Sequence, residues 1–248
     1  APIFSLVENT DTVFVEVGTE YIDSGFMASD NYDTTFYLST TGKVYTEKLD
    51  TFLLEYQVYD KSGNGSEVKF RTVIVVDRTA PIVELPFDSI KIEVGRRVNF
   101  PEPWVYDNYD RTPQLSIIGS FDKDIVGEYE IEYVAVDHSG NVSDTVVLFV
   151  YVIDNIPPTI ELNGAPLITH CRWESFTDSG VAVGDNYYEF EEIEVEVRYV
   201  NTSDENVSSE QMIQSNGYYT AIYTAIDDSR NSTQAYRTIL VEECDPNS

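Results

Sequence analysis

Aspartate and asparagine residues recur in three short motifs whose oxygen atoms could bind a metal ion. One set consists of Asp77-Arg-Thr-Ala-Pro81, Asp107-Asn-Tyr-Asp110 and Asp137-His-Ser-Gly-Asn141. Related motifs stand at residues 30–33, 60–64, 154–158, 185–188 and 227–231. Carboxylate and carbonyl oxygens are hard donors, and Ca²⁺ takes about six to eight of them, whereas Mg²⁺ retains much of its water shell. If folding brings these motifs together, the chemistry they favour is the binding of Ca²⁺.

The motifs return at a nearly fixed spacing along the chain. Asp77 and Asp154 are 77 residues apart, and so are Asp30 and Asp107, while Asp185 follows Asp107 after 78 residues. A fixed period of this kind is the signature of tandem repeats. The sequence therefore predicts three domains, which are residues 1–77, 78–154 and 155–248.

The composition limits the classes of partner. Lys and Arg total 15 against 44 Asp and Glu, which gives a formal net charge of −29. So acidic a chain is unsuited to nucleic acid or to an anionic membrane surface, and it suits cations. Aromatic residues make up 13% of the chain, which favours a folded protein over a disordered one. Since no apolar run approaches about 18 residues, we expect no membrane insertion.

Alternating and β-branched segments predict the secondary structure. The strongest strand patterns are residues 52–59 and 68–76, and their counterparts 129–136 and 146–153, with an Asp-x-Ser-Gly-Asn turn inside each pair. Such pairs are typical of β-hairpins. Helical periodicity is absent apart from a weak pattern at residues 208–213. We therefore expect an all-β fold, with each repeat packed as a sandwich.

The motifs taken together resemble a known family, the bacterial Ig-like surface repeat. The resemblance rests on Glu16-Val-Gly18, on the run from Asp23 through Asp33, on Tyr56-Gln-Val-Tyr-Asp-Lys-Ser-Gly-Asn64 and on the Val-rich strand that ends before Asp77. It covers nearly all of the first two repeats and both ends of the third, and the hyalin repeat is a more distant likeness. The resemblance implies Ig-like β-sandwich domains arranged end to end in an exported bacterial protein, either secreted or at the cell surface. It implies a scaffold and no particular activity.

In an Ig-like sandwich the two acidic loops of one domain lie at the end that receives the preceding linker. We therefore expect a structural Ca²⁺ at each domain junction, where it would offset the repulsion between carboxylates. The expected metal ligands are Asp77, Asp107, Asn108, Asp110 and Asp137 at the first junction, and Asp154, Asp185, Asn186 and Asp227 at the second. The alternative is that these motifs only form turns, because Asp, Asn and Gly favour turns whatever their partners.

The third repeat departs from the other two. Its two cysteines, Cys171 and Cys244, fit no zinc spacing and are expected to form a disulfide of an exported protein. By counting, Cys244 replaces the linker aspartate, so the third repeat is expected to be a terminal or specialised cap. About 12 inserted residues centre on the polar run 201–209, which favours a lengthened hairpin. We expect Trp104 and Trp173 to be buried, and the alternative is that they stack on a sugar.

No pattern of catalytic residues is present. His138 and His170 have no partner motif, no catalytic glycine-rich motif occurs, and pairs of carboxylates are too abundant to be informative. We therefore expect a non-enzymatic surface protein, a calcium-rigidified rod that serves as an adhesin stalk or spacer. One alternative is a module that binds a surface glycan or protein through its third domain, at Tyr187, Tyr188, Tyr218 and Tyr219. Another is a subunit that self-assembles into fibres through strand edges.

Overall fold

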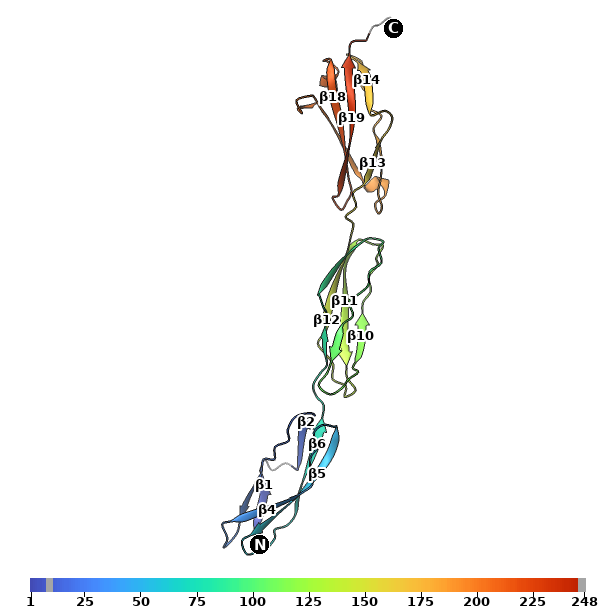
Figure 1. The fold of residues 1–248 in the computed structure, drawn as a ribbon. Helices are drawn as coiled ribbons and strands as arrows, with labels where there is room; N and C mark the ends of the chain where they lie inside the picture. The colour runs from blue at the N-terminus through green and yellow to red at the C-terminus, as the bar shows by residue number, and fades with distance from the viewer. Residues whose placement is uncertain (8–10, 245–248) are drawn as a thin grey trace. The chain divides into compact units, whose positions relative to one another are not determined.

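The computed structural model describes residues 1–7 and 11–244, and these residues are almost entirely β-structure (Figure 1). The strands of the first repeat are β1 (Ile3–Leu6), β2 (Thr12–Glu16), β3 (Phe26–Ser29), β4 (Phe36–Thr41), β5 (Asp50–Asp60) and β6 (Lys69–Val76). Those of the second are β7 (Ile82–Glu84), β8 (Ser89–Glu93), β9 (Trp104–Tyr106), β10 (Gln114–Ile118), β11 (Gly127–Val136) and β12 (Val146–Ile153). The third has β13 (Thr159–Leu162), β14 (Leu167–Cys171), β15 (Val181–Gly184), β16 (Glu194–Val200), β17 (Asn206–Val207), β18 (Gly217–Ile226) and β19 (Ser232–Glu242).

The chain divides into two compact units. The first comprises Ala1–Asp88, Phe100–Ser120 and Glu130–Leu148, and the second comprises Ser89–Asn99, Phe121–Tyr129 and Phe149–Ser248. The boundaries fall inside β11 and β12, so the three-domain division stays a prediction from the repeats. Among the described residues, no helix is long and apolar enough to cross a membrane.

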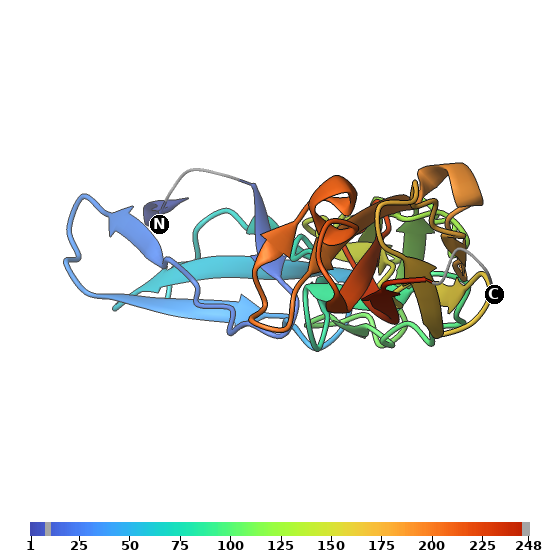
Figure 2. The ribbon, with the colours of Figure 1, turned by 90° about the horizontal axis from the view of Figure 1, so that it is seen from above.

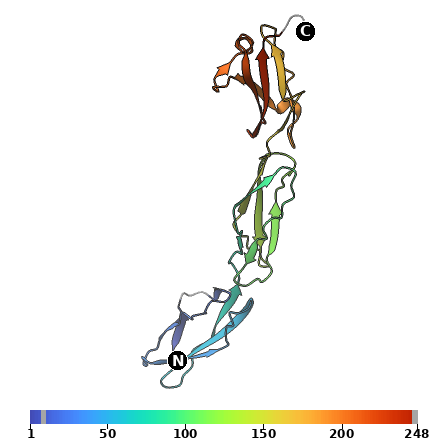
Figure 3. The ribbon, with the colours of Figure 1, turned by 45° about the horizontal axis from the view of Figure 1, so that its top comes forward.

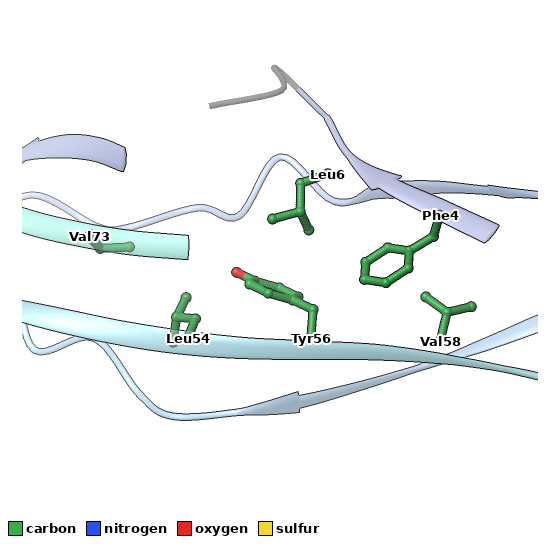
Figure 4. Close-up of a cluster of buried hydrophobic side chains, with 6 residues drawn as sticks. All are labelled: Phe4, Leu6, Leu54, Tyr56, Val58 and Val73. Atoms are coloured by element: carbon green, nitrogen blue, oxygen red, sulfur yellow. The ribbon is translucent and has the colours of Figure 1, made fainter. Parts of the chain in front are cut away.

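In the first repeat, which lies in the first compact unit, two layers enclose an apolar core. A sheet with the order β2-β6-β5-β4 faces the pair β1-β3, and β5 and β6 run antiparallel side by side (Figure 2). Inward positions alternate along β5, where Leu54, Tyr56 and Val58 are buried. Phe4 and Leu6 of β1 point toward these side chains from the other layer (Figure 4). This period-2 burial is why the sequence pattern predicted β5 and β6, and both predictions are confirmed.

The third repeat, which lies in the second compact unit, has the same plan with an added hairpin. Its main sheet has the order β14-β19-β18-β16-β17, and the pair β13-β15 contributes Ile160, Leu162 and Val181 to the core against it. β14 lies beside the long β19 in parallel pairing (Figure 3). The inserted segment forms the β16–β17 hairpin, closed by a hydrogen bond from Asn201 N to Glu205 O (3.0 Å), and then the single helical turn α1 (Ser209–Met212). A 3-10 turn, η1 (Phe190–Glu192), precedes β16.

The second repeat forms a sheet with the order β10-β11-β12-β8 and the separate pair β7-β9. In every repeat an early strand pairs in parallel with the last strand: β2 with β6, β8 with β12, and β14 with β19. In the first two repeats these parallel pairs place the Glu-Val-Gly segment beside the linker that follows the last strand.

A buried arginine network in the third repeat had no signal in the sequence. Arg237 is 1% exposed, and its guanidinium donates to Asp178 Oδ1 (2.5 Å), to Tyr223 OH (3.1 Å) and to the carbonyl oxygen of Asn163 (2.7 Å). The first repeat has a similar network around Arg71, and the second has the buried Leu148 at the corresponding position. A buried guanidinium is tolerated because carboxylate and carbonyl acceptors surround it.

The expectation of buried tryptophans was wrong. Trp104 is 64% exposed and Trp173 is 65% exposed. Trp104 lies on β9, a short strand on which alternate residues are exposed. Trp173 lies in the turn that follows β14, outside the strands that supply the core.

Candidate metal centres

Three aspartates converge in the first compact unit to form what we term the first acidic cluster, Asp77, Asp107 and Asp137. Each directly follows a strand end: Asp77 follows β6, Asp107 follows β9 and Asp137 follows β11. One carboxylate oxygen from each lies within 4.8 Å of the others. Asp77 and Asp137 are buried, and Asp107 is partly buried. Sequence reasoning expected these three residues to meet, and the structure brings them together.

The second compact unit contains the second acidic cluster, Asp154, Asp185 and Asp227. These residues directly follow β12, β15 and β18, and their carboxylate oxygens also lie within 4.8 Å of one another. Asp154 is 4% exposed and Asp227 is 2% exposed. The two clusters are therefore built from the same three positions of successive repeats.

Short-range hydrogen bonds fix each loop and leave some of the carboxylate oxygens without a partner. In the second cluster, Asp185 Oδ1 accepts from the backbone N–H groups of Tyr187 (2.8 Å) and Tyr188 (3.0 Å). Asn231 Nδ2 donates both to Asp227 Oδ2 (2.9 Å) and to the carbonyl oxygen of Asp154 (3.1 Å), so it joins the linker to the loop. Asn141 makes the same pair of contacts in the first cluster.

Several carboxylate oxygens in the clusters are buried without a hydrogen-bond partner. They are the Oδ2 atoms of Asp107, Asp154 and Asp185. A buried, unpaired acceptor is costly, and a buried charge is tolerated when it is paired or binds a metal. These atoms fit a cation better than they fit solvated surface acids.

The crowding of carboxylates changes their protonation. Burial, followed by the negative charges of Asp107 and Asp137, raises the pKa of Asp77 above its ordinary value. Burial also raises the pKa of Asp154, and the adjacent carboxylates of Glu93 and Asp185 raise it further. Both shifts mean that the ionised clusters lack sufficient compensating positive charge within the protein.

The remaining predicted ligands lie around the clusters with other contacts. Asp110 Oδ2 accepts from His138 N (3.0 Å) and lies 2.6 Å from His138 Nδ1, while its Oδ1 accepts from Thr112 N. The Asn108 amide lies 3.5 Å from Glu16 Oε1. Asn186 Nδ2 donates to Asp154 Oδ1 (3.3 Å), so it contacts the second cluster directly.

Sequence reasoning missed one glutamate beside each cluster. Glu16, the last residue of β2, accepts from Arg78 N (3.1 Å) and from Thr79 Oγ1 (2.7 Å) in the linker. Glu93, the last residue of β8, accepts from Asn155 N (3.2 Å) and lies beside Asp154. The signal in the sequence was the recurrence of Glu-Val-Gly at residues 16–18 and 93–95, which by itself does not connect the glutamate to the linker.

The disulfide occupies the position of this glutamate contact in the third repeat. In each repeat the residue after this position donates its backbone N–H to a carbonyl oxygen near the end of the last strand at 2.8 Å; the donors are Val17, Val94 and Arg172. These equivalent hydrogen bonds show that Cys171 corresponds to Glu16 and Glu93. They also show that Cys244 corresponds to Arg78 and Asn155. Cys171 and Cys244 are bonded, and their Cα atoms are 5.3 Å apart. A covalent bond thus replaces the hydrogen bonds by which glutamate holds the linker.

The match to known families falls on the first repeat. Residues 6–75 match the family model described as "Bacterial surface protein, Ig-like domain". This segment belongs to that family. The family description indicates an Ig-like module of a bacterial surface protein. The comparison with curated proteins finds no match.

Solved structures with similar folds are only distantly related. Drosophila N-cadherin EC1-4 is 15% identical, with 98% of this chain and 76% of that chain covered and a TM-score of 0.35. Protocadherin Gamma B2 domains 3-6 are 12% identical, with 98% and 73% covered and a TM-score of 0.39. The fibronectin(III)-like modules of Clostridium thermocellum CbhA are 17% identical, with 66% and 94% covered and a TM-score of 0.29. Likeness at this level transfers no function.

Proposed function

We propose that this protein is a non-enzymatic cell-surface module whose linkers are held by Ca²⁺ at the two acidic clusters. The observation that carries the proposal is the set of buried, unpartnered carboxylate oxygens at the point where three aspartates converge. The family match of residues 6–75 supports an exported, surface-located protein. Three predicted Ig-like domains, joined through these clusters, would serve as a stalk or spacer for adhesion.

The donor set favours Ca²⁺ over other divalent ions. Asp77, Asp107 and Asp137 would hold the first ion, and Asp154, Asp185 and Asp227 the second, with backbone carbonyls and water as further ligands. Zn²⁺ is less suitable because its structural sites use Cys and His, and the clusters contain neither. When bound, the ion supplies the positive charge that the clusters lack.

A bound ion would connect the linker to the loops that follow it in sequence. Asp77 and Asp154 belong to the linkers, whereas the other four aspartates belong to loops of the next repeat. Glu16 and Glu93 already hold the backbone of the same linkers by hydrogen bonds. Ca²⁺ would therefore restrict the linkers, and its removal should leave them held by hydrogen bonds alone.

The test is calcium titration of EGTA-treated protein by isothermal titration calorimetry, combined with small-angle X-ray scattering. We expect two sites, one lost in Asp107→Asn and the other in Asp185→Asn. Both substitutions keep the side-chain oxygen that accepts the loop N–H groups. The control is Asp204→Asn, which removes an exposed charge in the inserted hairpin. Absence of binding heat, together with unchanged scattering in EGTA, would refute the calcium proposal.

A further inference from the structure

The turn after the first parallel strand has the same backbone in all three repeats. Gly18 N donates to Thr46 O (2.7 Å), Gly95 N to Lys123 O (2.8 Å) and Trp173 N to Ile213 O (3.0 Å). All three residues have positive φ, at 78°, 78° and 70°. Trp173 therefore occupies a left-handed position that the other two repeats assign to glycine.

A tryptophan at this position opposes the local backbone preference. Left-handed conformations are readily adopted by glycine and are outliers for bulky side chains. The fold does not require a large side chain there, because a Cβ atom at Gly18 would meet nothing within 4 Å. Strain that the fold does not need points to a function of the side chain.

The indole of Trp173 is open to solvent and is held on a rigid base. It is 65% exposed, and the guanidinium carbon of Arg172 lies 5.4 Å from its ring centroid. Arg172 is fixed in turn by Glu243 Oε1, at 2.8 Å from Nη2. The disulfide of Cys171 anchors the preceding residue. The aromatic surface is therefore presented in a defined orientation instead of on a free loop.

The charged side chains around the indole determine which class of ligand could bind there. Three exposed carboxylates accompany it: Glu174 is the next residue, Glu242 is brought near by the pairing of β14 with β19, and Glu243 is already paired with Arg172. Carboxylates repel an anionic ligand and accept hydrogen bonds from hydroxyl groups. A flat aromatic face offers stacking to the C–H face of a sugar ring.

We propose that Trp173 is the stacking residue of a binding site for a neutral carbohydrate, with adjacent carboxylates that accept from its hydroxyl groups. This site goes beyond the calcium-dependent function and does not depend on it. Trp173 and the residues of its turn belong to the third repeat, the region that sequence reasoning offered as an alternative binding module. A carbohydrate is favoured over a protein because one indole with separate polar acceptors suits a small, hydroxyl-rich ligand.

The proposal is tested on the full chain with a printed array of neutral and sialylated glycans. We expect binding to at least one neutral glycan and a loss of about tenfold or more in Trp173→Gly. This variant restores the residue that the other repeats use, so its melting temperature should be equal or higher. Trp104→Ala is the matched control, since Trp104 is equally exposed, and it should bind as the native protein does.

Three results would overturn the proposal. The first is that the native protein binds no neutral glycan on the array. The second is that folded Trp173→Gly binds as the native protein does. The third is that the protein binds intact cells through Trp173 and continues to do so after enzymatic removal of their glycans, which would indicate a protein partner.

Discussion

Neutralising Asp185 gives the sharpest test of the second acidic cluster, because the structure sets an upper limit on the separation of its charges. At this limit of 4.8 Å, two unit charges repel by about 0.9 kcal/mol in water and by about 3.5 kcal/mol at an effective dielectric constant of about 20. Asp185→Asn removes two of the three repulsions, or about 2 to 7 kcal/mol. The cluster can avoid the repulsion by protonating one aspartate, which costs about 4 kcal/mol at pH 7. The repulsion therefore cannot destabilise the native protein by more than about 4 kcal/mol. We therefore expect the calcium-free variant to be more stable by about 2 to 4 kcal/mol.

The measurement is urea unfolding in EGTA and in Ca²⁺, followed by tryptophan fluorescence. In EGTA the Asp185→Asn variant should have the higher free energy of unfolding, and in Ca²⁺ it should gain less stability than the native protein. Asp204→Asn, which removes an equal charge from an exposed turn, should match the native protein in both buffers. If the two variants behave alike in EGTA, the carboxylates of the second acidic cluster do not repel one another as the structure requires.

Three further outcomes follow from the same structure. Folding raises the pKa values of Asp77 and Asp154, so ionisation of these carboxyl groups destabilises the folded state at neutral pH. This destabilisation disappears as the pH falls to about 4, where aspartate becomes protonated in the unfolded chain as well. In calcium-free protein the destabilisation by these two groups should therefore shrink as the pH falls toward about 4. If calorimetry gives a difference in melting temperature between the native protein and Asp77→Asn/Asp154→Asn that does not change with pH, this reasoning is contradicted. Arg237→Leu should cost about 3 to 5 kcal/mol in urea unfolding, because Asp178 would remain buried without its partner, and adding Asp178→Asn should recover part of the loss. Reducing the disulfide should lower the stability of the third repeat by about 2 to 5 kcal/mol, and an unchanged melting curve in reductant would be the contrary result.

Much of the fold could be predicted because it depends on local alternation and on the repeat. The strand patterns at 52–59 and 68–76 correspond to β5 and β6, since inward and outward residues alternate along both strands. The convergence of Asp77, Asp107 and Asp137 followed from their place at strand ends in one topology. Periodicity and strand direction carry this information without any knowledge of side-chain contacts.

Contacts between distant segments could not be predicted in this way. Glu16 lies far from Arg78 in sequence, and only the parallel pairing of β2 with β6 brings them together.

Counting residues along the third repeat to find the equivalent of the linker aspartate was wrong by one position. In the first repeat Ser66 forms a bulge through hydrogen bonds with Val58, whereas in the third repeat Ile226 pairs directly with Ser232.

This missing bulge corrects the assignment of Cys244. Because the last hairpin of the third repeat is one residue shorter, the residue that corresponds to the linker aspartate is Glu243, and Cys244 corresponds to the next position, Arg78 in the first repeat. Sequence counting cannot detect a bulge, because the insertion of one residue leaves the apolar pattern on either side unchanged. The disulfide therefore replaces the glutamate contact to the linker and not the aspartate.

The disulfide also determines how the chain would respond to tension. A chain pulled from its ends loads the parallel pairs β2–β6 and β8–β12 in shear, so their hydrogen bonds must fail together. Once a repeat of 77 residues yields, its chain can extend to a length of about 250 Å, at about 3.3 Å per residue. In the third repeat the bond between Cys171 and Cys244 closes a segment with a sequence separation of 73, and that segment cannot extend. A tether made of these repeats would thus have two extensible segments and one of nearly constant length, which carries the exposed indole of Trp173.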